Sequence, residues 1–256
     1  MKCYVINLDR APERYAAFCA CAKRTALEVV RVAAVDGRSE PIPEAAPWRA
    51  FWLHGRPYHP ANAALTKSCA KTLRLFLETE DEHALICEDD AVLPENMAEI
   101  LEETLQYSDT WDILRLNGLH TSFTFPNRLF PYAELTTCDS RLNRIFGWFN
   151  GTGAYVVNRH AADVILKHLA PYYMPFDHYL QTMYYYGLKT AIAFPYPVTL
   201  SELAHTSTIA CPPAAPLWKK LFRVQYLTAL PYRGMQELIA WCFQARNLIW
   251  KLMKNL

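Results

Sequence analysis

The chain has 256 residues, enough for one large domain, and its 52% hydrophobic and 20% charged residues exclude a disordered protein. We find no signal-peptide pattern and no apolar stretch of roughly 18 residues, so we expect a cytoplasmic protein without a membrane-spanning helix. The eight cysteines form no Cys-x-x-Cys pair, which argues against zinc and thioredoxin motifs and favours free thiols. We expect no nucleic-acid partner.

Strand and helix patterns alternate along the first 118 residues. Short β-branched or apolar runs predict the strands, and apolar residues spaced three to four apart predict the helices. We expect strands at 3–8, 29–35, 84–87 and 111–117, and between them helices at 12–23, 61–78 and 94–107. This order predicts an α/β fold with a mainly parallel sheet.

The pattern is less regular elsewhere. Residues 39–60 indicate a loop with a short helix at 48–53, and residues 120–149 indicate loops with hairpin pieces. We then expect a strand at 151–157, a helix at 159–169, an aromatic helix to 186 and a strand at 190–194. A proline-rich hinge follows, so we divide the chain into a catalytic body, 1–210, and a tail, 211–256.

An apolar run, Ala84 to Cys87, opens directly onto three consecutive carboxylates, Glu88, Asp89 and Asp90. In open α/β sheets ligands bind just beyond the carboxyl ends of strands, so this triplet lies where a ligand is expected. Neighbouring like charges repel one another, and either their pKa values rise or a cation offsets them. Oxygen ligands of this kind suit Mg²⁺ or Mn²⁺ carrying a diphosphate. The alternative is a solvated junction between strand and loop.

Six segments in order resemble glycosyltransferase family 25, the bacterial lipo-oligosaccharide sugar transferases related to the collagen galactosyltransferases. They are VINLDRAPER at 5–14, AVDG at 34–37, ALICEDDAVL at 84–93, WDILRLNG at 111–118, GTGAYVVNRHAADVIL at 151–166 and PFDHYL at 175–180. The resemblance covers about the first 210 residues. It implies a GT-A-like fold, a UDP-sugar donor, a divalent metal and transfer with inversion. One departure is Ser68-Cys69, where the family usually has Ser-His.

The resemblance implies that the triplet plays the part of an Asp-x-Asp motif. Asp90 would then hold Mn²⁺ or Mg²⁺, with Glu88 or Asp89 helping, and the metal would stabilise charge on the leaving nucleotide as a Lewis acid. His205, in a polar loop, is a candidate to complete the metal shell. The alternative is that His205 binds no metal.

Inversion requires a general base on the acceptor hydroxyl, and Asp177 is our candidate. Its alternative role is an N-cap, because it begins a helix after Pro175, and Glu202 is a weaker candidate base. Asn7, Arg10 and Arg14 are assigned to uridine or phosphate, although Arg14 could simply form a surface ion pair. The other residues assigned to substrate binding are Asp36, Gly37, Ser68, Glu88, Asp89, Asn117 and Gly153.

The tail differs in charge from the body. Residues 216–256 contain seven basic residues and one acidic residue, a net charge of +6, whereas the preceding 215 residues carry 19 basic and 24 acidic residues, or −5. From 233 to 255, polar residues recur on one helical face and Trp-rich apolar residues occupy the other. This pattern indicates a helix that lies on an anionic membrane surface. The alternatives are docking on the body or on a second copy of the chain.

We therefore hypothesise a peripheral enzyme on the inner face of the cytoplasmic membrane that moves a hexose, galactose first among the candidates, from UDP to a lipid-linked lipo-oligosaccharide. A nucleotidyltransferase on a similar sheet is one rival. It would normally have a glycine-rich loop after the first strand, and the first glycine here is Gly37. A non-catalytic membrane-bound scaffold is the other rival.

Overall fold

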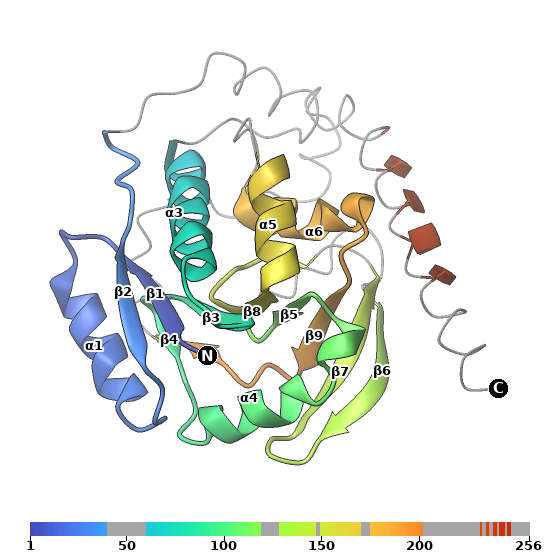
Figure 1. Cartoon of the computed structure of the whole chain (residues 1–256), viewed down its shortest axis with the longest axis horizontal. Coiled ribbons are helices and arrows are strands. Elements are labelled where there is room, and N and C mark those ends of the chain that lie inside the picture. The colour runs from blue at the N-terminus through green and yellow to red at the C-terminus, as the bar shows by residue number, and fades with distance from the viewer. Residues whose placement is uncertain are drawn as a thin grey trace, which may run out of the picture.

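The computed structural model describes residues 1–39, 60–118, 128–146, 149–169 and 175–201, with ten positions between 231 and 246. In these residues an eight-stranded sheet forms the centre of the molecule, in the order β2-β1-β3-β8-β5-β9-β7-β6 (Figure 1). Its strands are β1 (Cys3–Asn7), β2 (Val29–Ala33), β3 (His83–Glu88), β5 (Ile113–Arg115), β6 (Arg128–Leu135), β7 (Ser140–Phe146), β8 (Ala154–Asn158) and β9 (Thr190–Phe194). A small antiparallel pair joins β4 (Ala91–Val92) to β10 (Thr199–Leu200).

The strands of the described sheet run mainly in one direction. The pairs β1–β2, β1–β3 and β5–β9 are parallel, and only β7 and β8 run against the other six strands. Strand β8 lies antiparallel between β3 and β5, so these two strands do not pair directly. The sheet is therefore mixed, and the expected α/β class with a mainly parallel sheet is confirmed.

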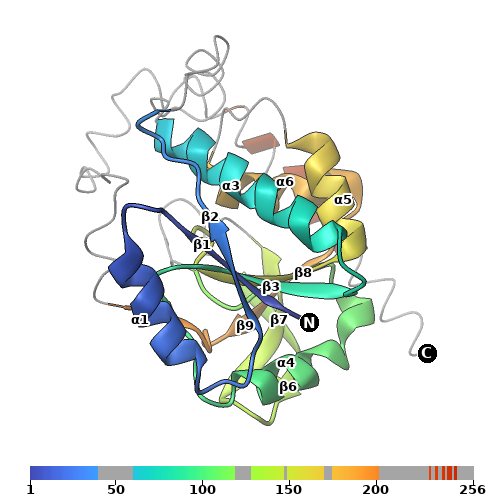
Figure 2. The ribbon, with the colours of Figure 1, turned by 60° about the vertical axis from the view of Figure 1, so that its left-hand side comes forward.

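Helices cover both faces of the sheet, as Figure 2 shows. Helices α1 (Pro12–Ala22) and α4 (Met97–Leu105) pack on one face, and α3 (Pro60–Leu77), α5 (Arg159–His168) and α6 (Phe176–Thr182) pack on the other. Two short 3₁₀ helices, η2 (Ser108–Thr110) and η3 (Met183–Tyr186), follow α4 and α6. The result is a three-layer arrangement with a hydrophobic core on each side of the sheet.

The two cores follow from the alternation of side chains along each strand. On β1, Cys3 and Val5 point to the α1 side, whereas Tyr4 and Ile6 point to the α3 side, and all four are buried. Strands β3 and β8 alternate in the same way. Because both faces are covered, these strands are apolar except at their ends. Burial of each large apolar side chain stabilises the fold by roughly 1.5–3 kcal/mol.

Up to residue 118 the predicted strands and helices are confirmed, with ends within three residues of the predicted ones. Between 128 and 146 the structure contains a full hairpin, β6–β7, where we expected loops with hairpin pieces. Pro131 lies at an irregularity of β6, an edge strand, which is where a sheet tolerates proline. The predicted strand at 151–157 begins only at Ala154, and the predicted helix at 48–53 lies outside the described residues.

The described positions between 231 and 246 are helical, and in both ribbon views they lie beside α6 and η3. The division of the chain at residue 210 stays a prediction, because residues 202–230 are outside the described part. Among the described helices, none combines the length and the hydropathy that crossing a bilayer requires.

Candidate active site

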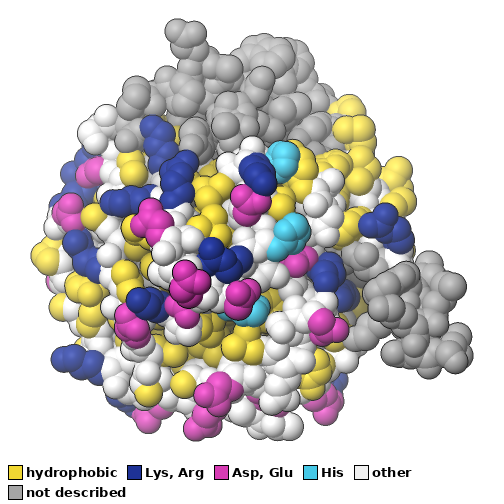
Figure 3. All heavy atoms as spheres, viewed as in Figure 1, with side chains coloured by type: hydrophobic (Ala, Val, Ile, Leu, Met, Phe, Trp, Pro, Cys, Tyr) yellow, Lys and Arg dark blue, Asp and Glu magenta, His cyan; other side chains and the backbone are white. Residues whose placement is uncertain are grey.

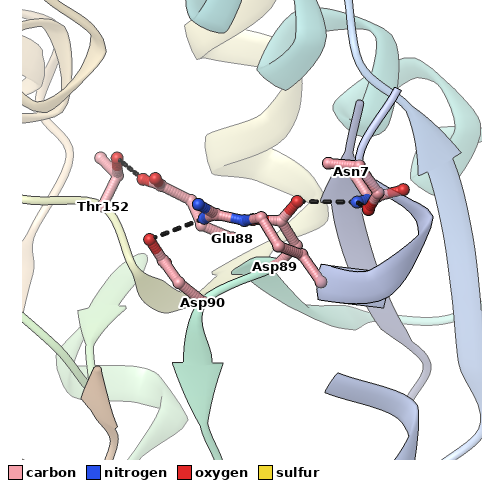
Figure 4. Close-up of polar contacts among 7 residues, drawn as sticks. Asn7, Glu88, Asp89, Asp90 and Thr152 are labelled. Atoms are coloured by element: carbon pink, nitrogen blue, oxygen red, sulfur yellow. Dashed lines mark hydrogen bonds and ion pairs between the residues drawn. The ribbon is translucent and has the colours of Figure 1, made fainter. Parts of the chain in front are cut away.

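Several strand ends meet at one edge of the sheet. The parallel strands β1, β2 and β3 all finish there, and β8 starts there because it runs the opposite way, with Ala154 paired to Cys87. The acidic triplet therefore lies between the end of β1 and the loop that precedes β8. Figure 4 shows Asn7 and Thr152 on opposite sides of Glu88, Asp89 and Asp90. This brings the amino-terminal segments of the chain together with residues about 150 positions away.

Arg14, from the first turn of α1, binds two members of the triplet. Its Nε donates to Asp89 Oδ1 at 2.7 Å, and its Nη2 lies 2.5 Å from the same oxygen and 2.9 Å from Asp90 Oδ2. Asn7 Nδ2 donates to the other oxygen of Asp89 at 2.7 Å. All four side chains are mostly buried. Both oxygens of Asp89 are thus bound by protein groups. The alternative prediction of an ion pair for Arg14 is confirmed, but its partners are the mostly buried acids of the triplet and not surface residues.

The charges of this cluster influence one another. Burial opposes the charged form of Arg14, but hydrogen bonds and charges from Asp89 and Asp90 outweigh it and raise its pKa. Burial also raises the pKa of Asp90, helped by the charge of Asp89 and opposed by Arg14. One guanidinium therefore offsets part of the negative charge of the triplet, as the crowding of like charges requires.

Glu88 is the most perturbed carboxylate of the site. Its pKa is raised to about 7, first by burial, then by the charge of Asp90, with smaller contributions from Asp177 and Asp89. Thr152 Oγ1 donates to Glu88 Oε1 at 2.5 Å and works in the opposite direction. Asp90, Asp177 and Asp89 are therefore all near enough to Glu88 to act on it electrostatically. Such shifts are enriched at functional sites.

The loop before β8 is held by two charged side chains besides Glu88. The guanidinium of Arg115, buried at the end of β5, donates from Nη1 to the Phe149 carbonyl at 2.5 Å and from Nη2 to the Gly151 carbonyl. Asp177 Oδ2 accepts the Gly151 backbone N–H at 2.9 Å. Burial lowers the pKa of Arg115, and the charge of Asp177 opposes this effect. Arg115 and Asp177 are therefore close enough to act on each other electrostatically.

Asp177 occupies the second position of α6, and the helix is preceded by Pro175 as its N-cap without a side-chain cap. The alternative prediction that Asp177 is an N-cap is therefore wrong. Its Oδ1 accepts the backbone N–H of His178 at 2.9 Å, so both carboxylate oxygens accept backbone donors. These two hydrogen bonds fix the orientation of the carboxylate at the start of α6.

A second cluster lies at the ends of β1 and β2. Arg31 donates from Nε and Nη2 to Asn7 Oδ1 at 3.0 and 2.9 Å, so it orients the amide that binds Asp89. Arg10 Nε lies 2.8 Å from Asp36 Oδ2. The pKa of Asp36 is lowered, first by the backbone N–H of Arg38 and then by the hydrogen bond and charge of Arg10, with burial opposing. This pair is partly exposed and borders the site.

Gly37 closes this side of the site against α3. A Cβ atom at Gly37 would lie 2.8 Å from Ala61 Cα, so no larger residue fits without moving the backbone. Ser68 fixes the segment that leads from β2 to Gly37. Its buried hydroxyl accepts the Val35 N–H at 2.8 Å and donates to the Ala64 carbonyl. The neighbouring Cys69 is buried, and burial raises its thiol pKa. Ser68 therefore positions the loop rather than offering a free hydroxyl.

Asn117 and Gly153 meet at the other side of the triplet. Asn117 Nδ2 donates to the Val198 carbonyl at 2.8 Å, and a Cβ atom at Gly153 would lie 2.5 Å from Asn117 Oδ1. The Gly153 carbonyl accepts the Glu88 N–H at 2.9 Å. Because Gly153 has no side chain, its backbone can lie close to the Asn117 amide and can accept the hydrogen bond from the Glu88 backbone.

Sequence reasoning missed Arg31, Arg115 and Thr152. Arg115 had a visible signal, since it is the one charged residue inside the apolar strand ILR, and a buried charge needs partners. Thr152 lies in the quoted Gly-Thr-Gly segment, but its partner could not be known without the sheet order. Arg31 looks like an ordinary outward-facing residue of β2, and nothing in its neighbourhood in the sequence identifies it.

Glu88 and Asp90 are the residues of the triplet that could hold a divalent metal. No cluster of three His, Cys, Asp or Glu side chains arranged as metal ligands occurs within the described ranges. Both oxygens of Asp89 are bound by Arg14 and Asn7, whereas Asp90 is bound by Arg14 through one oxygen only. Glu88 and Asp90 therefore remain as candidate ligands, and burial together with the charge of Asp90 raises the pKa of Glu88. Two carboxylates suffice where phosphates and water fill the other positions. His205 lies outside the described residues.

Comparison with known proteins gives one family. The model of glycosyltransferase family 25, described as an LPS biosynthesis protein, matches residues 1–180. No curated protein matches. A crystal structure of a glycosyltransferase involved in the glycosylation of the major capsid of PBCV-1 is similar at 12% identity and a TM-score of 0.37, over 75% of this chain and 82% of that one. The inositol-1-phosphate CTP transferase from T. maritima is similar at 11% identity and a TM-score of 0.36, over 75% and 66%. Because the family model spans 180 of 256 residues, the chain belongs to glycosyltransferase family 25, whose members are glycosyltransferases of LPS biosynthesis.

Proposed function

We propose that the protein transfers a hexose, with galactose as the first candidate, from a UDP-sugar to a lipo-oligosaccharide, with inversion at the transferred carbon. The observation that carries the proposal is the group of carboxylates Asp90, Glu88 and Asp177 at the carboxyl edge of the sheet, in which burial, and then the charges of Asp90 and Asp177, raise the pKa of Glu88. A site of this kind has an excess of negative charge that a cation would relieve. It also contains Asp177, a carboxylate from a separate element that would serve for proton transfer.

On the donor side, Glu88 and Asp90 would hold Mn²⁺ or Mg²⁺. When bound, the metal would neutralise charge on the departing diphosphate. Arg14 and Asn7 hold Asp89, and Arg14 also holds Asp90, so that Asp90 is fixed in place before a ligand arrives. Arg10 and Asp36 form the partly exposed pair beside the triplet and would bind phosphate and ribose respectively. A preorganised arrangement of this kind costs no rearrangement when charge develops.

On the acceptor side, Asp177 would take the proton of the attacking hydroxyl. Inversion requires a base opposite the leaving group, and Asp177 comes from α6 and the loop at Gly151, whereas Glu88 and Asp90 come from the end of β3. The backbone N–H groups of Gly151 and His178 donate to its two carboxylate oxygens and orient them. Arg115 fixes the same loop through the carbonyls of Phe149 and Gly151, and so holds Asp177 at a constant position relative to Glu88.

The test is UDP release from a panel of UDP-hexoses, with Mn²⁺ or with EDTA, and with or without a de-acylated, water-soluble oligosaccharide acceptor. We expect metal-dependent release that the acceptor accelerates, and a product whose anomeric configuration by NMR is inverted. Asp90→Asn should abolish the metal dependence. Asp177→Asn should reduce acceptor-dependent release by about 10²–10⁴-fold and leave UDP binding within a few-fold. Full acceptor-dependent turnover by either variant would refute its assigned role.

A further inference from the structure

The described helical positions near the carboxyl end leave an apolar stripe in solvent. Met235, Leu238 and Trp241 are 52%, 65% and 37% exposed, and their spacing of three residues places them along one side of the helix. Phe243 is less exposed and faces the body, where its ring lies 6.0 Å from that of Tyr184 in η3. The helix is thus seated on the body through Phe243 with the stripe pointing elsewhere.

Two tyrosines of η3 are exposed on the body next to this contact. Tyr185 and Tyr186 are 40% and 46% exposed, and the ring of Tyr186 stacks on that of His168 at 3.6 Å. Figure 3 shows hydrophobic side chains gathered at the edge of the molecule where the described carboxyl-terminal positions run. We call Tyr185, Tyr186, Met235, Leu238 and Trp241 the aromatic edge. Tyrosine and tryptophan are the residues that occupy the boundary between lipid and water.

Charge identifies the partner of this surface. Residues 216–256 carry seven basic side chains and one acidic side chain, whereas the rest of the chain is net negative. Among the described positions, Arg246 of the same helix is exposed, and its guanidinium lies 5.3 Å from the Phe243 ring centroid. A symmetric contact between two copies through this surface would bring two positively charged tails together. An anionic lipid surface complements both the apolar stripe and the charge.

We propose that the aromatic edge lies in the headgroup region of an anionic membrane and brings the active site to a lipid-anchored acceptor. The second half of this statement rests on the proposed function. Asp177 and Tyr185 belong to the continuous segment α6–η3 and are eight residues apart, which is about 12–16 Å along the helix. An acceptor whose lipid stays in the membrane needs only a few sugar units to span this distance.

The test is co-sedimentation of the full chain with phosphatidylglycerol-containing vesicles and with pure phosphatidylcholine vesicles. We expect binding to the anionic vesicles that salt weakens. Leu238→Glu and Trp241→Glu should each lower this binding by about tenfold or more, because they replace an apolar contact by a charge that anionic lipid repels. Ala20→Glu, which adds the same charge on an exposed position of α1, is the matched control and should bind like the unchanged protein.

The same variants separate this proposal from the proposed function. Leu238→Glu should transfer sugar normally to a water-soluble oligosaccharide and about tenfold less to the same acceptor in vesicles. Equal vesicle binding by Leu238→Glu and Ala20→Glu would overturn the lipid assignment, even if transfer is found. A concentration-dependent dimer in lipid-free buffer that Leu238→Glu disperses would assign the stripe to a second copy and also overturn it. Vesicle binding without any transfer would leave the surface standing and refute the proposed activity.

Discussion

Replacing Glu88 by Gln should remove the loss of stability that Glu88 causes in the metal-free protein as pH rises. The pKa of Glu88 is raised from 4.5 to about 7 in the folded state, so the folded protein binds more protons than the unfolded chain between these values. The free energy of unfolding must then fall as pH rises from about 4.5 to about 7, and change little beyond. Gln cannot lose a proton, and it is close to Glu in size.

The magnitude follows from the shift. Each pKa unit corresponds to about 1.36 kcal/mol, so a group with pKa values of 4.5 unfolded and about 7 folded costs about 2.5 kcal/mol more at pH 8 than at pH 5. Glu88 is partly accessible to water, which screens its neighbours' charges, so we expect about 2 kcal/mol.

The assay is urea unfolding in EDTA at pH 5, 6, 7 and 8 for both proteins. Other titrating groups shift both curves alike, so the difference between the two proteins isolates Glu88. The free energy of unfolding of Glu88→Gln, relative to that of the unchanged protein, should increase by about 2 kcal/mol from pH 5 to pH 8. Mn²⁺ should remove most of this gain by stabilising only the protein that retains Glu88. A difference that does not change with pH would refute the assignment of a raised pKa to this carboxylate.

Three further changes test neighbouring contacts. Thr152→Val removes a hydrogen bond that lowers the pKa of Glu88, so it should raise this pKa further and shift the pH dependence of metal binding to higher pH. Thr152→Ser retains the hydroxyl and should leave that pH dependence unchanged. Equal titrations of the two variants would contradict this role. Arg115→Met should lower kcat for transfer about tenfold to a hundredfold at nearly constant UDP affinity, because the loop at Gly151 is released; steady-state kinetics and UDP titration decide, and an unchanged kcat would count against it. Glu103→Gln should lower stability by about 1 kcal/mol at pH 7 with activity unchanged. The Glu103 carboxylate accepts hydrogen bonds from Thr136 and Thr137, which outweigh the effect of burial and lower its pKa to about 2. This stabilisation is lost as pH falls below about 4.5 toward 2. Urea unfolding should therefore give little difference between Glu103→Gln and the unchanged protein near pH 2.

Local pattern was enough to predict most of the elements. The apolar run of β3 and the three-to-four spacing of α3 are properties of neighbouring residues, and their ends were predicted within one residue. The β6–β7 hairpin was predicted only in pieces, because Pro131 interrupts the pattern and its edge position, which tolerates proline, is a property of the whole sheet.

The site could be predicted only in part for a similar reason. The triplet and Asp177 are recognisable by composition, but the partners of each carboxylate depend on which strands are neighbours. The insertion of β8 beside β3 decides that Thr152 meets Glu88, and no residue spacing in the sequence contains that information. Arg14 was assigned to the ligand, whereas the structure places it between Asp89 and Asp90.

The reversed direction of β8 divides the site between two separate stretches of chain. The segments that end β1, β2 and β3 lie within the first 90 residues, whereas the loop at Gly151 and the start of α6 come 60 or more residues later. Under the proposed function, the first stretch recognises the nucleotide and the second the incoming sugar. Evolution could therefore diversify glycan structures by exchanging the later stretch alone, and hybrid transferases could be engineered along the same seam.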